Sequence, residues 1–260
     1  MKQAAEWIFR AHQARAKFAP LPPGLAPKSA GDAYLIQSEY VGLRPASLGK
    51  VAGYKIALTT PAMRAMVGMN DSVAGDMLEK TILRGNSRIR AADYVRLIVE
   101  FEIAFELADD LPAIGAPYDR GSVAKAVGAV MPAFELADDR NADYTTLPGN
   151  ALMLIADNAW NEGAVLGAPV KDWQGIDLAA LKGTATINGE KVGEGHGRDV
   201  MGHPLDALAW LANHLASRNL GLWRGAVVIT GSMVTSKFPK AGDRIRFEAG
   251  ELGAVELSVD

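Results

Sequence analysis

The sequence predicts an α+β fold in which helices come first and an antiparallel-rich β body follows, with one helix inserted into it. Two observations predict this order. Apolar residues recur at helical spacing in much of the first 66 residues, and from residue 97 they fall at alternate positions. A dinucleotide-binding Rossmann fold is excluded because no Gly-x-Gly-x-x-Gly follows a strand. We expect an N-terminal helical region over residues 1–80 and a β-rich catalytic body over residues 81–260, packed as one compact unit.

Periodicity and proline positions predict the N-terminal elements. Apolar residues lie on one helical face from Trp7 to Phe18, and the prolines that begin at Pro20 end this helix. Thr60 followed by Pro61 is typical of an N-cap with proline in the first helical position. The predicted elements are, in order, a helix up to residue 18, a proline-rich arm over 20–27, a helix over 30–43, a strand over 53–58 and a helix over 61–66.

The β body begins with the clearest strand of the chain. Alternate positions from Leu97 to Leu107 are all apolar, which is typical of a strand with one buried face. Asn188 and Gly189 form a typical two-residue hairpin turn, and Pro204 opens an amphipathic helix. The other predicted elements are, in order, a helix from Ser122 to about Met131, strands over 134–136 and 152–156, a hairpin over 184–195, a helix over 204–215 and strands over 226–230, 243–247 and 254–259.

Charge and composition exclude several classes of partner. Lys plus Arg number 27 against 30 Asp plus Glu, so the net charge of −3 leaves no basic excess to bind nucleic acid or an anionic membrane. No apolar stretch approaches the roughly 18 residues of a membrane-spanning helix. The basic, amphipathic start is interpreted as a mature helix rather than a transit peptide, and we expect a cytoplasmic protein. Because the chain has no cysteine, carboxylates or histidines would have to hold any metal.

Glutamates in the predicted strand over 97–107 are candidate metal ligands. Glu100 and Glu102 are two residues apart, so both carboxylates point to one side of the strand. Two converging carboxylates suit a hard divalent cation such as Mg²⁺ or Mn²⁺, although the solvated face of an edge strand has the same pattern. Glu135 lies in an otherwise apolar segment and is either a third ligand or a surface residue.

Three other side chains are candidates for binding or catalysis. Lys55 lies in a short apolar strand, where it is either paired and able to act as an acid or base, or exposed. Arg198 lies in a glycine-rich stretch ahead of a helix, which is either an anion site or a turn. Ser232 lacks the frame of a nucleophilic serine and is at most a substrate-positioning hydroxyl. The four histidines form no metal-type cluster, and we expect them in exposed or capping positions.

Eight short stretches match one known family in their order along the chain. They are Asp32–Gln37, Gly53–Thr59, Val99–Phe105, Pro132–Glu135, Ala156–Ala159, Met201–Asn213, Thr230–Ser232 and Ala241–Asp243. Together they resemble the 2-keto-4-pentenoate hydratase branch of the fumarylacetoacetate hydrolase superfamily, which includes 2-hydroxypentadienoate hydratases and 4-oxalocrotonate decarboxylases. The resemblance spans nearly the whole chain.

The resemblance implies a fold, an assembly and a metal site. The implied fold is a mixed β-roll or barrel-like body with an N-terminal helical region, and the implied assembly is a homo-oligomer. The implied ligands of Mg²⁺ or Mn²⁺ are Glu100, Glu102 and Glu135. Lys55 would shuttle protons, its pKa lowered by a nearby cation or by partial burial. Glu79 and Asp157 are further candidates for handling water or the distal end of the substrate.

The implied reaction is hydration of a small 2-hydroxy-2,4-dienoate to a 4-hydroxy-2-oxo acid, in the meta-cleavage breakdown of aromatic compounds. A 2-oxo acid decarboxylase on the same scaffold is the alternative. An acylpyruvate C–C hydrolase ranks below both because no histidine lies between His12 and His196. A catalytically silent partner subunit is the non-enzyme alternative, and the presence of Lys55 and the three glutamates is evidence against it.

The sequence departs from the family pattern at three places. Ile98 stands where the family often has a basic residue, Trp160 stands where it has a small serine, and the loop over 73–80 matches poorly. We expect these changes to alter the size and polarity of a pocket in which Trp160, Arg198 and Ser232 contact the substrate.

Overall fold

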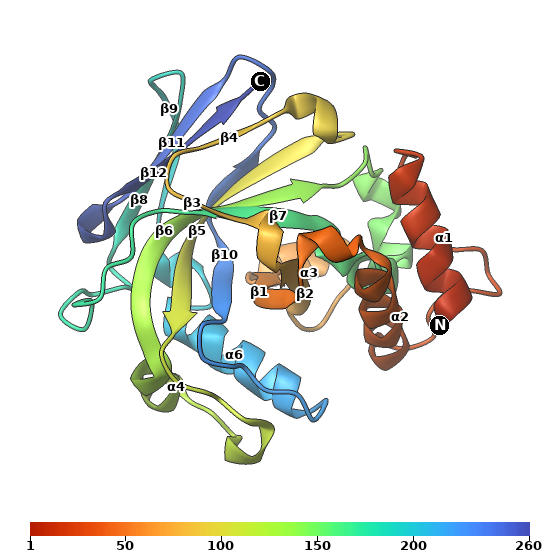
Figure 1. Ribbon diagram of the computed structural model, residues 1–260, viewed down its shortest axis with the longest axis horizontal. Coiled ribbons are helices and arrows are strands. Elements are labelled where there is room, and N and C mark those ends of the chain that lie inside the picture. The colour runs from red at the N-terminus through yellow and green to blue at the C-terminus, as the bar shows by residue number, and fades with distance from the viewer.

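Two β-sheets form the body of the molecule, which the computed structural model describes over the whole chain from Met1 to Asp260. The large sheet has seven strands in the order β2-β1-β10-β5-β6-β7-β3, and the small sheet has five in the order β4-β12-β11-β8-β9. The long strands β5 and β6 curve strongly (Figure 1), so the large sheet curls like half of a barrel. The predicted mixed α+β fold with a barrel-like β body is therefore confirmed.

The strands differ widely in length. Those of the large sheet are β1 (Val51–Ala57), β2 (Val73–Leu78), β3 (Ile82–Arg84), β5 (Leu97–Leu107), β6 (Val127–Asp138), β7 (Asn161–Leu166) and β10 (Val227–Lys237). Those of the small sheet are β4 (Ser87–Ile89), β8 (Lys182–Ile187), β9 (Glu190–His196), β11 (Arg244–Ala249) and β12 (Ala254–Val259). β5 and β6 pair along their whole length as an antiparallel ladder, and this ladder forms the centre of the large sheet.

The helices lie at the periphery, with α1 and α2 together on one side and α6 near α4 on another (Figure 1). The α-helices are α1 (Lys2–Gln13), α2 (Ala30–Leu43), α3 (Pro61–Val67), α4 (Arg120–Ala126), α5 (Ala151–Ala156) and α6 (Pro204–Ala216). The 3-10 segments are η1 (Ala46–Leu48), η2 (Glu79–Thr81), η3 (Ala91–Asp93), η4 (Ala113–Gly115), η5 (Tyr144–Gly149), η6 (Asn158–Trp160), η7 (Gly197–Asp199) and η8 (Gly250–Leu252). None of these helices has the length and apolar character needed to cross a bilayer.

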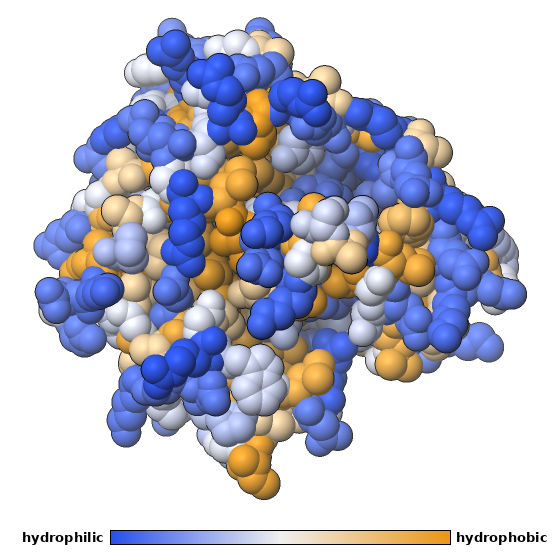
Figure 2. All heavy atoms as spheres, in the orientation of Figure 1, coloured by the Kyte–Doolittle hydropathy of each residue, from blue (hydrophilic) through white to orange (hydrophobic).

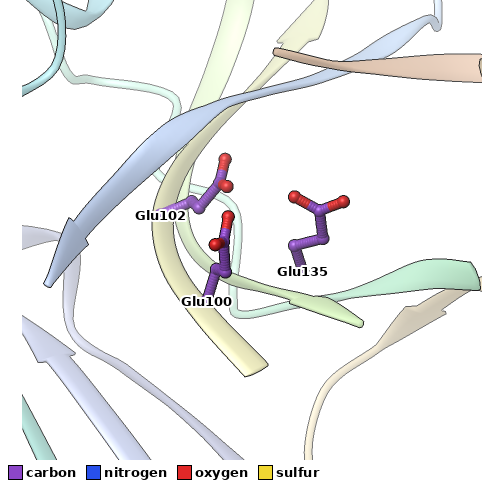
Figure 3. Close-up of side chains that lie close together, drawn as sticks. All are labelled: Glu100, Glu102 and Glu135. Atoms are coloured by element: carbon purple, nitrogen blue, oxygen red, sulfur yellow. The ribbon is translucent and has the colours of Figure 1, made fainter. Parts of the chain in front are cut away.

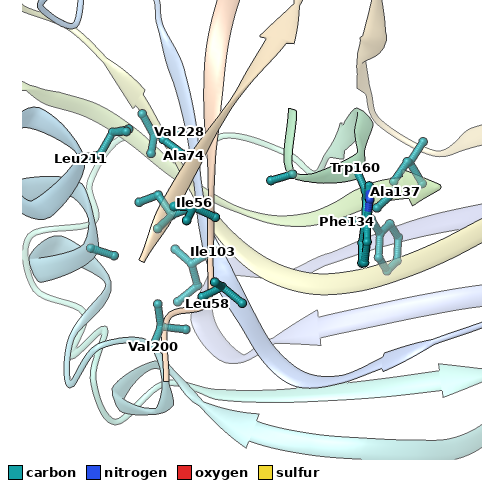
Figure 4. Packing of buried hydrophobic residues seen from close by; sticks show 14 of the residues in the cluster. Ile56, Leu58, Ala74, Ile103, Phe134, Ala137, Trp160, Val200, Leu211 and Val228 are labelled. Carbon is teal, nitrogen blue, oxygen red and sulfur yellow. The ribbon is translucent and has the colours of Figure 1, made fainter. Parts of the chain in front are cut away.

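The core lies between the sheets and under the helices. The ring centroid of Phe101 on β5 lies 5.6 Å from that of Phe134 on β6 and 5.6 Å from that of Phe247 on β11. This edge-on aromatic packing joins the two sheets. Ile56 and Val228 belong to the same core and lie beside α6 (Figure 4). On the surface, hydrophilic residues cover most of the periphery of the face shown in Figure 2, with hydrophobic atoms visible between them towards the middle.

Several local predictions are confirmed at the level of hydrogen bonds. Thr60 caps α3 by accepting from the Met63 amide, with Pro61 at the first helical position, as predicted. Ser29, which the sequence analysis did not single out, caps α2 by accepting from the Asp32 amide. The β8–β9 hairpin turns at Asn188 and Gly189, whose φ angles of 54° and 84° match a type I′ turn.

Three local predictions are wrong. The helix expected up to residue 18 ends at Gln13, and the chain turns at Arg15, whose φ angle is 51°. Residues 152–156, predicted as a buried strand, form helix α5, because a short and wholly apolar run has no period that separates strand from helix. The helix expected from Ser122 to Met131 ends at Ala126, and the chain continues directly as β6, so the strand is much longer than predicted. The N-cap of this helix, α4, is Asp119 and not Ser122, which instead completes a capping box.

The first 80 residues contain strands as well as helices. α1 and α2 pack against each other, whereas β1 and β2 belong to the large sheet. β1 pairs in parallel with β10, and Lys55 lies opposite Ile229 in this pairing. On its other side β1 pairs in antiparallel with β2. The segment over 73–80, which departs from the family pattern, therefore forms a strand over most of its length. The pairing of β1 carries Lys55 into the sheet that holds the glutamates.

Candidate metal centre

Three carboxylates converge on the concave centre of the large sheet (Figure 3). Glu100 and Glu102 come from β5 and Glu135 from β6, and one oxygen of each lies within 4.8 Å of those of the other two. The β5–β6 register places Glu100 directly opposite Glu135. The spacing of two residues within β5 puts Glu102 on the same face, as the sequence predicts.

Each carboxylate is held by a different neighbour. The Gly231 amide donates to Glu102 Oε2 at 2.6 Å, and the Asn161 side-chain amide donates to Glu135 Oε1 at 2.9 Å. The Ser236 hydroxyl donates to Glu100 Oε1. After these bonds, one oxygen of Glu102 and one of Glu135 remain buried without a hydrogen-bond partner.

Lys55 is the cation next to this cluster. Its Nζ lies 3.0 Å from Glu135 Oε1, and its side chain is 4% exposed. Burial by itself would lower the pKa of Lys55, but the adjacent carboxylates, Glu135 first, raise it above its ordinary value. The sequence analysis expected a lowered pKa for Lys55, whereas the protein groups alone raise it. A divalent cation among the same carboxylates would act in the opposite direction.

The charge balance of the cluster favours a divalent cation. Three carboxylates and one ammonium carry a net charge of −2 when all are ionised, in a place where Glu102 and Glu135 have no exposed surface. Burial, together with the neighbouring carboxylates, raises the pKa of Glu102 well above its ordinary value. Burial also raises the pKa of Glu135 to about 7, against the opposing effect of Lys55. Orphaned carboxylate oxygens with these pKa values fit a hard divalent cation that takes oxygen ligands.

A cavity of about 140 Å³ opens beside the carboxylates. Its charged residues are Lys55 and Glu100, and Ser236 is also at this end. The remaining lining residues are hydrophobic: Ala57, Leu58, Met63, Met66, Val67, Ile98, Ala137, Tyr144, Leu147, Leu154, Ala159 and Trp160. The arrangement places a site for a chelating, charged group next to an apolar recess.

Trp160 and Ile98, two of the departures from the family pattern, both line the cavity. Ser236 and Asn161 were missed by the sequence analysis. Ser236 lies four residues beyond Ser232 on β10, and nothing in the spacing of the chain distinguishes it from other strand serines. Asn161 begins β7, beside Glu135 on the neighbouring strand.

The other predicted site residues do not line this cavity. Glu79 on η2 and Arg198 on η7 are exposed. The Ser232 hydroxyl accepts from the Phe101 amide at 2.9 Å and donates to the Val234 carbonyl oxygen at 2.6 Å, so it joins strands β10 and β5. None of these three side chains forms a hydrogen bond or ion pair with the carboxylate cluster, although Ser232 lies opposite Glu102 in the β10–β5 ladder.

Asp157 is buried at the start of η6 and does not line the cavity. Its Oδ1 lies 2.6 Å from Nε2 of His12 on α1, and its Oδ2 accepts from buried Arg140. His12 is thus partly buried in an ion pair, contrary to the exposed or capping position expected of it. Asn158 and Trp160 have φ angles of 53° and 61°, so the chain turns tightly between Asp157 and the cavity wall.

Comparisons with known proteins agree with this geometry. Residues 60–260 match the model of the fumarylacetoacetate (FAA) hydrolase C-terminal family. The 2-oxo-hept-4-ene-1,7-dioate hydratase of Escherichia coli is 32% identical over 86% of this chain and 84% of its own length. The 2-hydroxyhexa-2,4-dienoate hydratase of Comamonas testosteroni is 31% identical over 96% of this chain and 94% of its own.

A solved structure shares the whole fold. The 4-oxalocrotonate decarboxylase from Pseudomonas putida G7, complexed with magnesium and adipate, superposes with a TM-score of 0.89 at 26% identity, over 100% of this chain and 97% of that one. The family model, the relatives and the fold all agree, and the chain belongs to the fumarylacetoacetate hydrolase family.

Proposed function

We propose that this protein is a metal-dependent hydro-lyase that adds water to a 2-hydroxy-2,4-dienoate to give a 4-hydroxy-2-oxo acid, in the meta-cleavage breakdown of aromatic compounds. The observation that carries the proposal is the buried cluster of three glutamates and one lysine at the end of an apolar cavity. The names of the Escherichia coli and Comamonas testosteroni relatives support the reaction.

In this proposal Glu100, Glu102 and Glu135 hold Mg²⁺ or Mn²⁺. The pair of unpartnered oxygens on Glu102 and Glu135 supports the assignment, as does the net charge of the cluster. When bound, such a cation supplies positive charge for the enolate that develops as the dienol becomes a ketone. Self-association of the chain is part of the same prediction, since the family implies a homo-oligomer.

Lys55 is the residue proposed to move protons. Ketonisation adds a proton to the end of the diene, and water then adds at C4 of the conjugated ketone. Lys55 lies at the junction of the carboxylate cluster and the cavity, where its Nζ is within reach of a bound substrate. Trp160 keeps its proposed place in the wall of the substrate pocket, whereas Glu79, Asp157, Arg198 and Ser232 are given no part in the chemistry.

Decarboxylation of a 2-oxo acid is the second candidate. It is favoured by the likeness of the whole chain to the 4-oxalocrotonate decarboxylase structure, at a TM-score of 0.89. The chemistry is related, because the distal carboxylate of 4-oxalocrotonate is that of a vinylogous 3-oxo acid, and its loss as CO₂ also leaves an enolate at the 2-oxygen that a cation would stabilise.

Product analysis distinguishes the two reactions. The purified protein is incubated with Mg²⁺ and either 2-hydroxypenta-2,4-dienoate or 4-oxalocrotonate, with EDTA as the control, and products are identified by mass spectrometry. Gain of one water by the dienoate that EDTA abolishes is the expected result. Loss of CO₂ from oxalocrotonate without hydration of the dienoate would instead identify a decarboxylase.

A further inference from the structure

The cavity has one charged end and one apolar end. Of its fifteen lining residues, only Lys55 and Glu100 are charged, and both belong to the carboxylate cluster. The part of the wall contributed by α3, η5, α5 and η6 consists of Met63, Met66, Val67, Leu147, Leu154 and Trp160, with Tyr144 and Ala159. A substrate whose carboxylate and 2-oxygen lie at the charged end therefore extends its distal end towards apolar side chains.

The cations nearest to this wall are already engaged. Lys55 is paired with Glu135 at 3.0 Å. Arg64 of α3 donates to the Leu58 carbonyl oxygen at 3.1 Å and does not line the cavity. Ile98, on the same face of β5 as Glu100, contributes an apolar side chain to the lining.

Arg96 is likewise engaged, outside the cavity. Its guanidinium lies 5.8 Å from the ring centroid of Tyr144 and is paired with the buried carboxylate of Asp139. The Tyr144 hydroxyl also donates to Asp139, at 2.8 Å, so its polar end is already bonded. A second carboxylate that lay against the buried part of this wall would lose its water and meet no positive partner.

Trp160 offers the apolar wall one polar atom. Its side chain is almost fully buried, and its indole Nε1 has no hydrogen-bond partner. A single neutral N–H donor satisfies a fraction of the four or so lone-pair sites of a carboxylate. It does not offset the desolvation of the charge.

We propose that the distal pocket selects 2-oxo and 2-hydroxydienoic acids that end in an uncharged, apolar group of several carbons, and that it discriminates against acids with a terminal carboxylate. The inference rests on the proposed function for its choice of head group. The whole cavity, which must also hold the head group, has a volume of about 140 Å³, close to that of an apolar cavity of roughly 150 Å³ that binds benzene. The names of the relatives include both a dioate and a hexadienoate, so family membership does not decide between these classes.

Equilibrium binding of unreactive analogues tests the selectivity. The Mn²⁺-loaded protein is titrated calorimetrically with 2-oxoheptanoate and with 2-oxoheptanedioate, which share the head group and the chain length and differ in the terminal carboxylate. We expect the monoacid to bind about 100-fold more tightly, since an apolar pocket rejects even an added neutral hydroxyl by about this factor and an unpaired carboxylate is harder to desolvate. Equal affinities, tighter binding of the dioate, or no binding of either acid would overturn the proposal.

Two variants of one residue, one cationic and one neutral, test the location of the distal end. Met66 is 47% exposed at the rim of the cavity, so Met66→Arg is tolerated by the fold and brings a cation to the apolar end. We expect Met66→Arg to raise the affinity for the dioate at least 10-fold relative to the monoacid. The neutral control Met66→Gln should leave the ratio within about 3-fold of the unmodified protein. An unchanged ratio in Met66→Arg would contradict the assignment of this wall to the distal end.

The binding assay separates this inference from the proposed reaction. Turnover is measured in parallel with 2-hydroxyhexa-2,4-dienoate and 2-hydroxyhepta-2,4-diene-1,7-dioate, and the monoacid should have the higher kcat/KM. Absence of turnover with both, alongside the expected preference in binding, would contradict the hydratase function and support the selectivity.

Discussion

Glu102 is completely buried and has one carboxylate oxygen without a hydrogen-bond partner. Substitution of this residue is therefore the most direct test of the proposed metal site. Glu102→Gln keeps the shape of the side chain and removes one of three negative charges. We expect Mn²⁺ affinity, measured by calorimetry, to fall at least 100-fold, because a hard cation loses an anionic ligand. The fold should persist, since a buried uncompensated charge is also removed.

A matched control lies on the same strand. Glu106 of β5 is paired with Arg84 near the surface and is away from the cluster. Glu106→Gln should leave Mn²⁺ affinity unchanged. Tight Mn²⁺ binding by Glu102→Gln would contradict the ligand assignment.

Lys55 allows metal binding and proton transfer to be separated. Lys55→Met keeps the buried stem and removes the ammonium that lies beside Glu135. We expect kcat to fall by 10²- to 10⁴-fold, the usual contribution of a positioned acid or base, while Mn²⁺ affinity changes by less than about 10-fold. Lys50, exposed just before β1, supplies the control Lys50→Met. Normal kcat in Lys55→Met would exclude Lys55 from the reaction.

At the scale of the element, His12 joins helix α1 to the rest of the molecule. Its ring lies 2.6 Å from Asp157, which in turn pairs with Arg140, so one buried carboxylate links α1 with η6 and the end of β6. Burial alone would lower the pKa of His12, but the charge of Asp157 and its hydrogen bond raise it to about 9. The ion pair between protonated His12 and Asp157 therefore stabilises the packing of α1 against the rest of the molecule.

This linkage predicts a pH-dependent loss of stability in His12→Asn. Because the folded-state pKa is raised above the ordinary value of 6.5, the stabilisation is complete below pH 6.5 and is lost as the pH rises through about 9. The difference between the two pKa values corresponds to roughly 3 kcal/mol. We expect the free energy of unfolding of His12→Asn, from urea denaturation, to fall below that of the unmodified protein by up to this amount at pH 6 and by much less at pH 10.

An exposed residue of the same helix is the control. Arg10 is paired with Glu6 on the outer face of α1. Arg10→Gln should show no such dependence between pH 6 and pH 10. A constant destabilisation of His12→Asn across this range would mean that His12 acts through packing and not through its charge.

For the whole molecule, metal binding should be coupled to folding and to pH. The raised pKa values of Glu102 and Glu135, the latter about 7, mean that both carboxyls hold protons more tightly in the folded protein. Without metal, the contribution of Glu135 to stability therefore decreases as the pH rises from about 4.5 to about 7, and that of Glu102 also decreases with rising pH. A cation must displace these protons at low pH, and above about pH 7 it finds Glu135 ionised.

We accordingly predict that Mn²⁺ raises Tm more at pH 8 than at pH 5.5. At 100 times Kd, binding to the folded state adds about 2.7 kcal/mol. Scanning calorimetry with and without Mn²⁺ at the two pH values measures the increment. Equal increments at the two pH values would show that the glutamates are ionised without the cation.

The periodicity of the chain was enough to predict that the candidate metal ligands Glu100 and Glu102 share one face of their strand. Alternation in β5 places Glu100 and Glu102 on one face, and the caps at Ser29 and Thr60 are determined by neighbouring residues. Short-range rules failed where an apolar run had no period, as at residues 152–156. Local chemistry is sufficient for these features because each depends on residues fewer than five positions apart.

Tertiary structure decided which candidates meet. Lys55 reaches Glu135 across 80 positions because β1 joins the large sheet through β10, and no spacing rule predicts which strands become neighbours. The same packing turned Asp157 towards His12 and placed Trp160 in the cavity wall. The sequence by itself determined the fold class, the family resemblance and which carboxylates are candidate metal ligands. The ammonium beside them and the apolar pocket arise only when distant strands and helices exclude water together.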